Sequence, residues 1–116
     1  MNKMSLVITE FRSGKACVLA LNGRIDSTNA EQLIGRVSEL LETGEKSLIV
    51  DLKEVLYLTS AAFRVLLVAT NEAERSAASF ALCSVIGQVR ELFEMGGLLE
   101  SFTIHASRDD ALAQVG

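Results

Sequence analysis

The sequence holds few side chains with which an enzyme could carry out acid–base, nucleophilic or metal chemistry. The only histidine, His105, stands at the end of a predicted strand, where a solvated or packed imidazole is favoured over a catalytic base. Zinc-protease, Cys-x-x-Cys, nucleophile-elbow and phosphate-loop motifs do not occur in the chain. Cys17 and Cys83 lie inside apolar runs, which indicates two buried thiols rather than a metal or redox pair.

Two pairs of carboxylates also have a structural explanation. Asp109 and Asp110 lie in the first turn of a predicted helix, where negative charge interacts favourably with the helix dipole. Glu72 and Glu74 stand two positions apart in another predicted helix, so their side chains cannot face each other. The sequence therefore predicts a protein that is not an enzyme and that needs no cofactor or metal.

The composition favours one domain over residues 1–116. The chain is 49% hydrophobic and contains no proline, so a single core without linkers is expected. Its 11 basic and 15 acidic residues give a net charge of −4 without a basic stripe, so nucleic acid is not an expected partner. The apolar runs are far shorter than the roughly 20 residues that span a bilayer. Since no signal-peptide pattern is present either, we expect a cytoplasmic protein without a membrane span.

Hydrophobic periodicity predicts strands that alternate with helices. The predicted strands are Leu6–Phe11, Ala16–Leu21, Ser47–Leu52, Phe80–Cys83 and Phe102–Ile104. Helices are expected after Gly23, from about Ala61 to Glu74, after Ser84 and after Ser107, with Val55–Leu58 as a short connection. The order β-β-α-β-α-β-α-β-α predicts an α/β fold with a mixed, mostly parallel sheet of about five strands and about four helices.

The first helix has the clearest local signals. Thr28 and Glu31 have the spacing of a capping box, and Gly44 is expected to end the helix in a left-handed conformation. One apolar face is predicted to contain Leu33, Ile34, Val37, Leu40 and Leu41.

The three later helices are each predicted to begin at a serine. Ser60 and Ser84 are expected to be N-caps, and Ser107 is expected to form a capping box with Asp110. An N-cap serine contributes about 1 kcal/mol to stability, and from the residues alone this role of Ser60 is favoured. Gly96-Gly97 is expected to end the third helix.

Two positions near Ser60 also have a structural interpretation. In the second helix only Arg64 interrupts the apolar first three turns, so one side is expected to meet the core and another a partner. Asp26 is expected to cap or orient the turn before the first helix.

Three segments carry a family resemblance in their order and spacing. The serine-bearing motif Thr59–Phe63 follows a strand that ends in Asp51-Leu52 and opens an apolar helix. Leu21–Asp26 forms a glycine turn before the first helix, and the late helix closes with Met95–Leu98. Together they resemble the anti-sigma factor antagonists of the STAS family over essentially the whole chain, which implies a STAS-like fold.

The resemblance implies a protein-binding switch. Ser60 would be the phosphorylated residue, with Thr59 as the second candidate. A partner serine kinase, itself the anti-sigma factor, would bind the unmodified form, free a sigma factor, and release the phosphorylated form. A separate serine phosphatase would reset the switch, and the protein would be a monomer or weak dimer. The implied partner-binding residues are Asp26, Thr59, Ser60, Ala61, Ala62 and Arg64.

Two departures from the family pattern leave alternatives open. Thr59 replaces the acidic residue of one form of the motif, and Ala62 replaces its usual glycine. The first alternative is a STAS adaptor subunit of a transport or signalling complex, in which Thr59 and Ser60 are structural and partner binding ignores the state of Ser60. The second alternative, an enzyme that hydrolyses nucleotides, is disfavoured by the missing phosphate loop and metal ligands.

Overall fold

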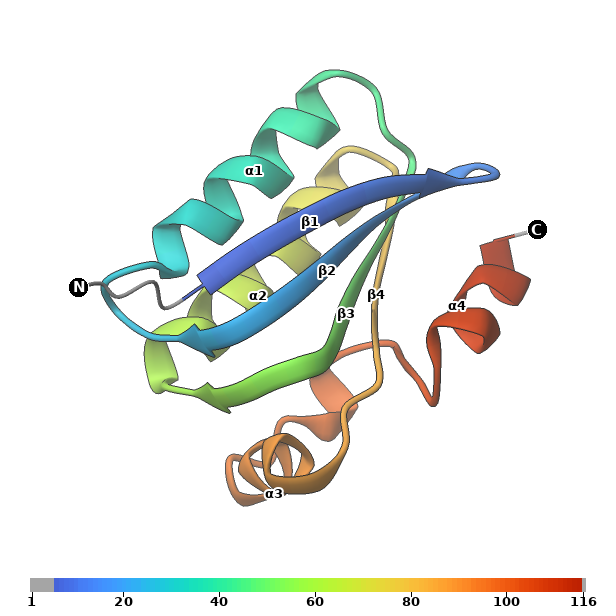
Figure 1. The fold of residues 1–116 in the computed structure, drawn as a ribbon. Helices are drawn as coiled ribbons and strands as arrows, with labels where there is room; N and C mark the ends of the chain where they lie inside the picture. Colours follow the sequence, from blue (N-terminus) through green and yellow to red (C-terminus); the bar gives the residue numbers. More distant parts are fainter. Residues whose placement is uncertain (1–5, 116) are drawn as a thin grey trace.

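The computed structural model describes residues 6–115, and this part of the chain forms one five-stranded sheet in the order β1-β2-β3-β4-β5 (Figure 1). The strands are β1 (Leu6–Ser13), β2 (Ala16–Ile25), β3 (Ser47–Leu58), β4 (Ser79–Cys83) and β5 (Ile104–His105). β1 pairs with β2 in the antiparallel sense, and all the following neighbours are parallel. The predicted mixed, mostly parallel sheet is therefore confirmed.

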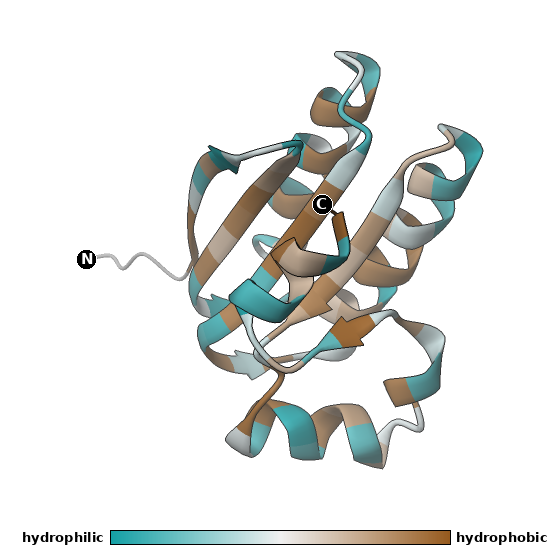
Figure 2. Ribbon diagram, turned by 90° about the vertical axis from the view of Figure 1, so that its right-hand side faces the viewer, coloured by the Kyte–Doolittle hydropathy of each residue, from teal (hydrophilic) through white to brown (hydrophobic). Residues whose placement is uncertain are grey.

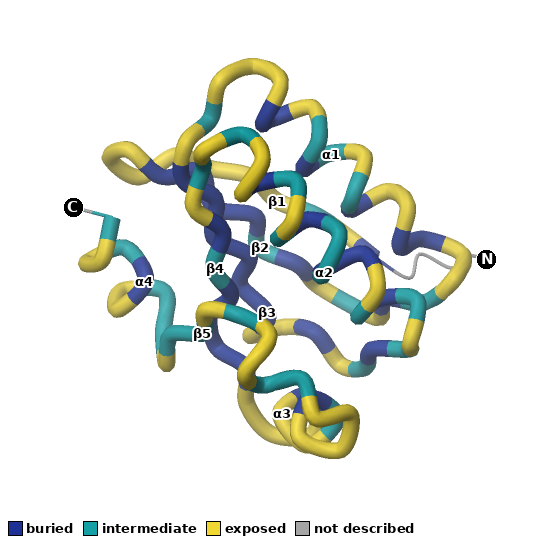
Figure 3. Tube along the Cα trace, turned by 180° about the vertical axis from the view of Figure 1, so that it is seen from behind, coloured by how far each residue is buried: buried dark blue, intermediate teal, exposed yellow. Residues whose placement is uncertain are grey.

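Within residues 6–115 four α-helices connect or follow the strands. They are α1 (Ala30–Glu42), α2 (Ser60–Arg75), α3 (Gly87–Met95) and α4 (Arg108–Val115), and a short 3-10 turn covers Leu99–Ser101. α1 and α2 lie side by side on one face of the sheet, whereas α4 covers the other (Figures 1 and 3). α3 packs against β3 near the end of the sheet where the parallel strands finish. This order of elements is the predicted one.

The core lies between the sheet and the α1–α2 layer, because alternate residues of the strands point to that face. Figure 2 shows the hydrophobic residues concentrated on the central strands and on the helix sides that meet them. The four residues Leu33, Val37, Leu40 and Leu41 of the predicted apolar face of α1 are buried, and Ile34 is partly buried. A smaller cluster beneath α4 contains Ala16, Val18, Ile49, Cys83 and Ala111.

The ends of α1 confirm one local prediction and correct another. Gly44 has φ +99°, and the N–H of Glu45 donates to the carbonyl of Leu40 at 3.1 Å, as in a left-handed helix end. The capping box at Thr28 is wrong, because the helix begins one residue later than that box requires. Asn29 is the N-cap residue, and the Thr28 hydroxyl donates to the carboxylate of Asp26 instead.

β3 is longer than predicted, and β5 begins later. Val55–Leu58 is not a connection: Val55 pairs with Gly23, and Leu58 pairs with Ile25 of β2. The polar pair Lys53-Glu54 interrupts the apolar pattern, and the register with β2 shifts between Asp51 and Glu54. The pairing resumes at Glu54 because backbone hydrogen bonds need no apolar side chain. At β5 the strand begins at Ile104, because Phe102 still belongs to the end of the preceding 3-10 turn. Its ring packs edge-on against Phe93, with ring centroids 5.7 Å apart.

Two of the three predicted serine N-caps are wrong. Ser60 is the first residue of α2, and Thr59 is the N-cap residue because its carbonyl accepts the first helical N–H groups, from Ala62 at 2.9 Å. Ser84 follows β4 in a left-handed conformation with φ +60°, and α3 starts three residues later. Ser107 is confirmed as a cap, since its Oγ accepts the N–H of Asp110 at 3.1 Å.

Candidate partner-binding site

The start of α2 is held against the end of β2. The Thr59 N–H donates to the carbonyl of Ile25 at 3.0 Å, and the Thr59 hydroxyl donates to the same carbonyl at 3.4 Å. Asp26 directly follows Ile25, so the loop between β2 and α1 lies beside the first turn of α2. The parallel register of β2 and β3 thus joins two segments that are far apart in the sequence.

The loop between β2 and α1 is ordered by its own polar side chains. The Asp26 carboxylate accepts the Thr28 N–H at 2.9 Å as well as the Thr28 hydroxyl. The Asp26 N–H donates to Asn29 Oδ1 at 3.0 Å, and the Asn29 amide donates to the carbonyl of Arg24 at 3.0 Å. The hydrogen bonds from Thr28 lower the pKa of Asp26, so this side chain is ionised at neutral pH. Asp26 orients the turn, as predicted.

The first turn of α2 presents Ser60 to solvent. Ser60 is exposed, Ala61 and Thr59 are partly buried, and Arg64 is exposed one turn further along the helix. Ala62 differs from the other expected partner-binding residues because it is 0% exposed and lies in the core. Its methyl group supports the surface from beneath and does not form part of it.

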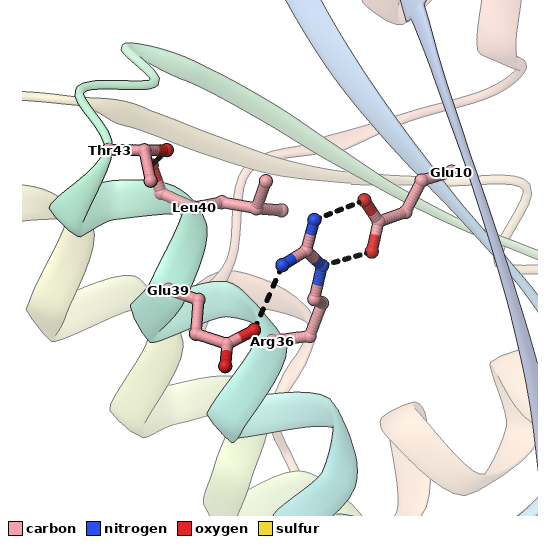
Figure 4. A network of polar contacts seen from close by, with 5 residues as sticks. All are labelled: Glu10, Arg36, Glu39, Leu40 and Thr43. Carbon is pink, nitrogen blue, oxygen red and sulfur yellow. Dashed lines mark hydrogen bonds and ion pairs between the residues drawn. The ribbon is translucent and has the colours of Figure 1, made fainter.

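An ion pair joins the two helices beside Ser60. Arg64 Nη2 lies 3.3 Å from Glu31 Oε2, and the side chains are 62% and 74% exposed. Arg36 also links α1 to β1: it binds Glu10 of β1 with Nη2 to Oε1 at 2.8 Å, and Glu39 of its own helix with Nη1 to Oε1 at 2.9 Å (Figure 4). The hydrogen bond from Arg36 lowers the pKa of Glu10, so the strand-to-helix pair stays ionised at neutral pH.

Exposed apolar side chains that were not predicted from the sequence border this end of the sheet. Leu56 of β3 is 64% exposed, Ile86 before α3 is 52% exposed, and Met95 at the end of α3 is 83% exposed. Next to Leu56, the guanidinium of Arg24 lies over the Tyr57 ring, 5.4 Å from the ring centroid. Leu56, a large apolar residue on the solvent side of a strand, was the sequence signal for this exposed surface. The signal was concealed because Val55–Leu58 was predicted to be a connection.

Metal ligands, the two cysteines and membrane-spanning helices were also considered from the sequence. No group of three or more His, Cys, Asp or Glu side chains within residues 6–115 is placed to hold a metal ion. Cys17 and Cys83 are free and buried, which confirms the interpretation as buried thiols. Burial raises the pKa of both, that of Cys83 to about 11. No helix in this part of the chain has the length and hydropathy needed to cross a membrane.

A family model for the STAS domain matches residues 8–111. The chain belongs to the STAS domain family. It is 33% identical over 96 residues, 83% of each chain, to a protein of Bordetella bronchiseptica named as the anti-sigma factor antagonist BtrV. The resemblance found in the three sequence segments is therefore confirmed.

Solved structures agree with this STAS assignment at the level of the fold. An anti-sigma factor antagonist from Mycobacterium paratuberculosis has a TM-score of 0.85 at 22% identity, with 96% of this chain and 94% of that chain covered. The Bacillus cell fate determinant SpoIIAA in its phosphorylated form has a TM-score of 0.73 at 20% identity, covering 95% of this chain and all 100% of that chain.

Proposed function

We propose that this STAS protein is an anti-sigma factor antagonist whose binding to an anti-sigma factor is controlled by phosphorylation of Ser60. The observation that carries the proposal is the position of Ser60, exposed in the first turn of α2 and beside the ordered loop at Asp26. The surface contains Asp26, Thr59, Ser60, Ala61 and Arg64, with Ala62 beneath it. The membership of the STAS family and the similarity to BtrV support this reading.

The phosphoryl transfer requires only an accessible hydroxyl on this chain. A serine kinase, itself the anti-sigma factor, transfers the γ-phosphoryl group of ATP to Ser60 Oγ, and the hydroxyl proton and ADP leave. A serine phosphatase reverses the modification by attack of water on phosphorus, which releases inorganic phosphate. Within residues 6–115 the Ser60 hydroxyl makes no hydrogen bond, so its modification breaks no hydrogen bond of the fold. Thr59 is the poorer acceptor because its hydroxyl is partly buried and directed to Ile25.

The fold tolerates the phosphate, whereas a bound partner does not. A phosphoserine carries about −1.5 to −2 charges at neutral pH, which the N-terminal end of a helix accommodates. A partner packed over Ala61 and Arg64 would have to remove water from this group, and burying an unpaired charge is costly. The phosphorylated protein therefore releases the partner and remains folded. We further propose that the protein acts in the cytoplasm as a monomer or weak dimer and catalyses no reaction.

The test is the intact mass of the protein isolated from its own cells, with Ser60→Ala and Thr59→Ala measured alongside. A phosphate-sized increment that is lost in Ser60→Ala and kept in Thr59→Ala is expected. An increment that survives in Ser60→Ala contradicts the assignment. Absence of any increment under all growth conditions favours the adaptor function, in which binding does not depend on Ser60.

A further inference from the structure

We propose that Arg64 exchanges its ion-pair partner when Ser60 is phosphorylated. The Arg64 guanidinium then releases Glu31 of α1 and binds the phosphate on Ser60 of α2. This inference rests on the proposed function, because it concerns the regulation of the same site. It assigns to Arg64 a role that the family motif does not contain: Arg64 forms an ion pair with the phosphate of its own chain.

The spacing on α2 places the two side chains together. Ser60 and Arg64 are four positions apart in one helix, so they lie one turn apart on the same face. Helical side chains lean toward the N-terminus, which directs Arg64 back to the first turn where Ser60 lies. An anion that precedes a cation by four positions is the more favourable order for such a pair. A phosphate on Ser60 is therefore within reach of the guanidinium.

The present partner of Arg64 is easily displaced. The distance of 3.3 Å between Arg64 and Glu31 is long for a charge-assisted hydrogen bond, and both side chains are more than half exposed. Exposed ion pairs of this kind contribute little to stability. A phosphate dianion offers the fork-shaped guanidinium more charge and more acceptor oxygens than a carboxylate does.

Among the charged groups around Ser60, Arg64 is the cation best placed to bind a phosphate on this residue. The Asp26 carboxylate is held by Thr28 and repels a phosphate. Arg24 lies on β2 with its guanidinium over the Tyr57 ring. The sequence of α2 contains one other basic residue, Arg75, which lies at the opposite end of the helix.

The exchange changes the charge pattern over two helices. In the unmodified protein Arg64 and Glu31 neutralise each other, and Ser60 is uncharged. After the exchange, the phosphate engages Arg64 and the Glu31 carboxylate on α1 is left without its cation. A partner that used Arg64 as a donor then loses it and also meets a new negative charge, so one modification alters a wider surface than Ser60 alone.

The experiment measures the second ionisation of the phosphate itself. Phosphoserine is placed at position 60 during translation by amber suppression, and the ³¹P resonance is followed against pH. A nearby cation favours the dianion and lowers its pKa from the ordinary value of about 6. We expect Arg64→Gln to raise this pKa by about 0.3 and Arg64→Lys to recover most of the difference.

The matched control is Arg24→Gln, which removes one positive charge from the neighbouring strand. A smaller change in this variant than in Arg64→Gln supports a direct pair. An identical phosphate pKa in the parent protein and in Arg64→Gln overturns the proposal, as does an equal rise in Arg24→Gln. Because Arg64 is exposed, its replacement leaves the core intact, and circular dichroism checks this.

Failure of this inference is distinguishable from failure of the proposed function. The phosphate is supplied by translation, so the measured pKa depends on neither a kinase nor a partner. An unchanged pKa leaves the mass measurement of Ser60 phosphorylation standing. Conversely, a protein that is never phosphorylated in its cells can still show the effect of Arg64.

Discussion

Replacement of Ser60 by alanine tests whether this side chain contributes to the stability of α2 or is available for the proposed phosphorylation. If Ser60 were the N-cap, the change would cost about 1 kcal/mol. The structure instead places Ser60 at the first helical position with no hydrogen bond from its side chain among the described residues. Alanine is the better helix former by up to about 0.5 kcal/mol, so the Ser60→Ala protein should be as stable as the parent or more stable by that amount.

The assay is urea unfolding followed by circular dichroism, with Ser107→Ala as the matched control. Ser107 does cap a helix through its Oγ, so its replacement should lower the free energy of unfolding by about 1 kcal/mol. A loss of that size in Ser60→Ala would refute the assignment of Thr59 as the N-cap residue. Equal stability in Ser60→Ala together with retained partner binding would show that neither the fold nor the binding needs the hydroxyl.

Other expected outcomes follow from the same structure. Ser60→Asp should keep the fold and weaken binding of the anti-sigma factor in a titration, and unchanged affinity would contradict the charge mechanism. Leu66→Asp should unfold the domain, because Leu66 is 0% exposed and an unpaired buried charge costs several kcal/mol; a native-like melting curve would contradict this. The Cys83 thiol, with its pKa raised to about 11 by burial, should react with iodoacetamide at pH 8 only after unfolding, as mass spectrometry of the labelled peptide would report.

The order of elements could be predicted because it depends on periodicity that each segment carries alone. Leu33, Val37 and Leu40 recur at helical spacing, and they are buried in α1. The short apolar run Phe80–Cys83 likewise matches β4 within one residue. Both signals come from side chains that must meet the core, so tertiary packing reinforces them.

The helix starts and the end of β3 could not be predicted from the same signals. Whether a serine is the N-cap depends on which carbonyl accepts the first helical N–H, and at α2 that is decided by Thr59, which is tied to Ile25 across the sheet. The second half of β3 is formed by pairing with β2 rather than by its own apolar pattern. These features depend on partners that are distant in the sequence.

The site itself combines both kinds of information. The motif at Thr59–Phe63 identified the serine, but the proximity of Asp26 follows only from the register of β2 and β3, and the Arg64–Glu31 pair only from the packing of α1 on α2. Ala62 was expected on the surface, yet its position as the third residue of α2 directs it to the core.

The proposed switch is compatible with the fold because Thr59 and Ser60 have different roles at the start of α2. A serine that both capped the helix and received the phosphate would couple modification to helix stability, because phosphorylation would change the cap. Here the Thr59 carbonyl begins the helix and the Thr59 N–H anchors it to Ile25, so the helix start depends on backbone groups. Under the proposed function, phosphorylation of Ser60 leaves these backbone contacts at the start of α2 in place. The phosphate then acts on the charged groups of the surface, including the Arg64–Glu31 pair.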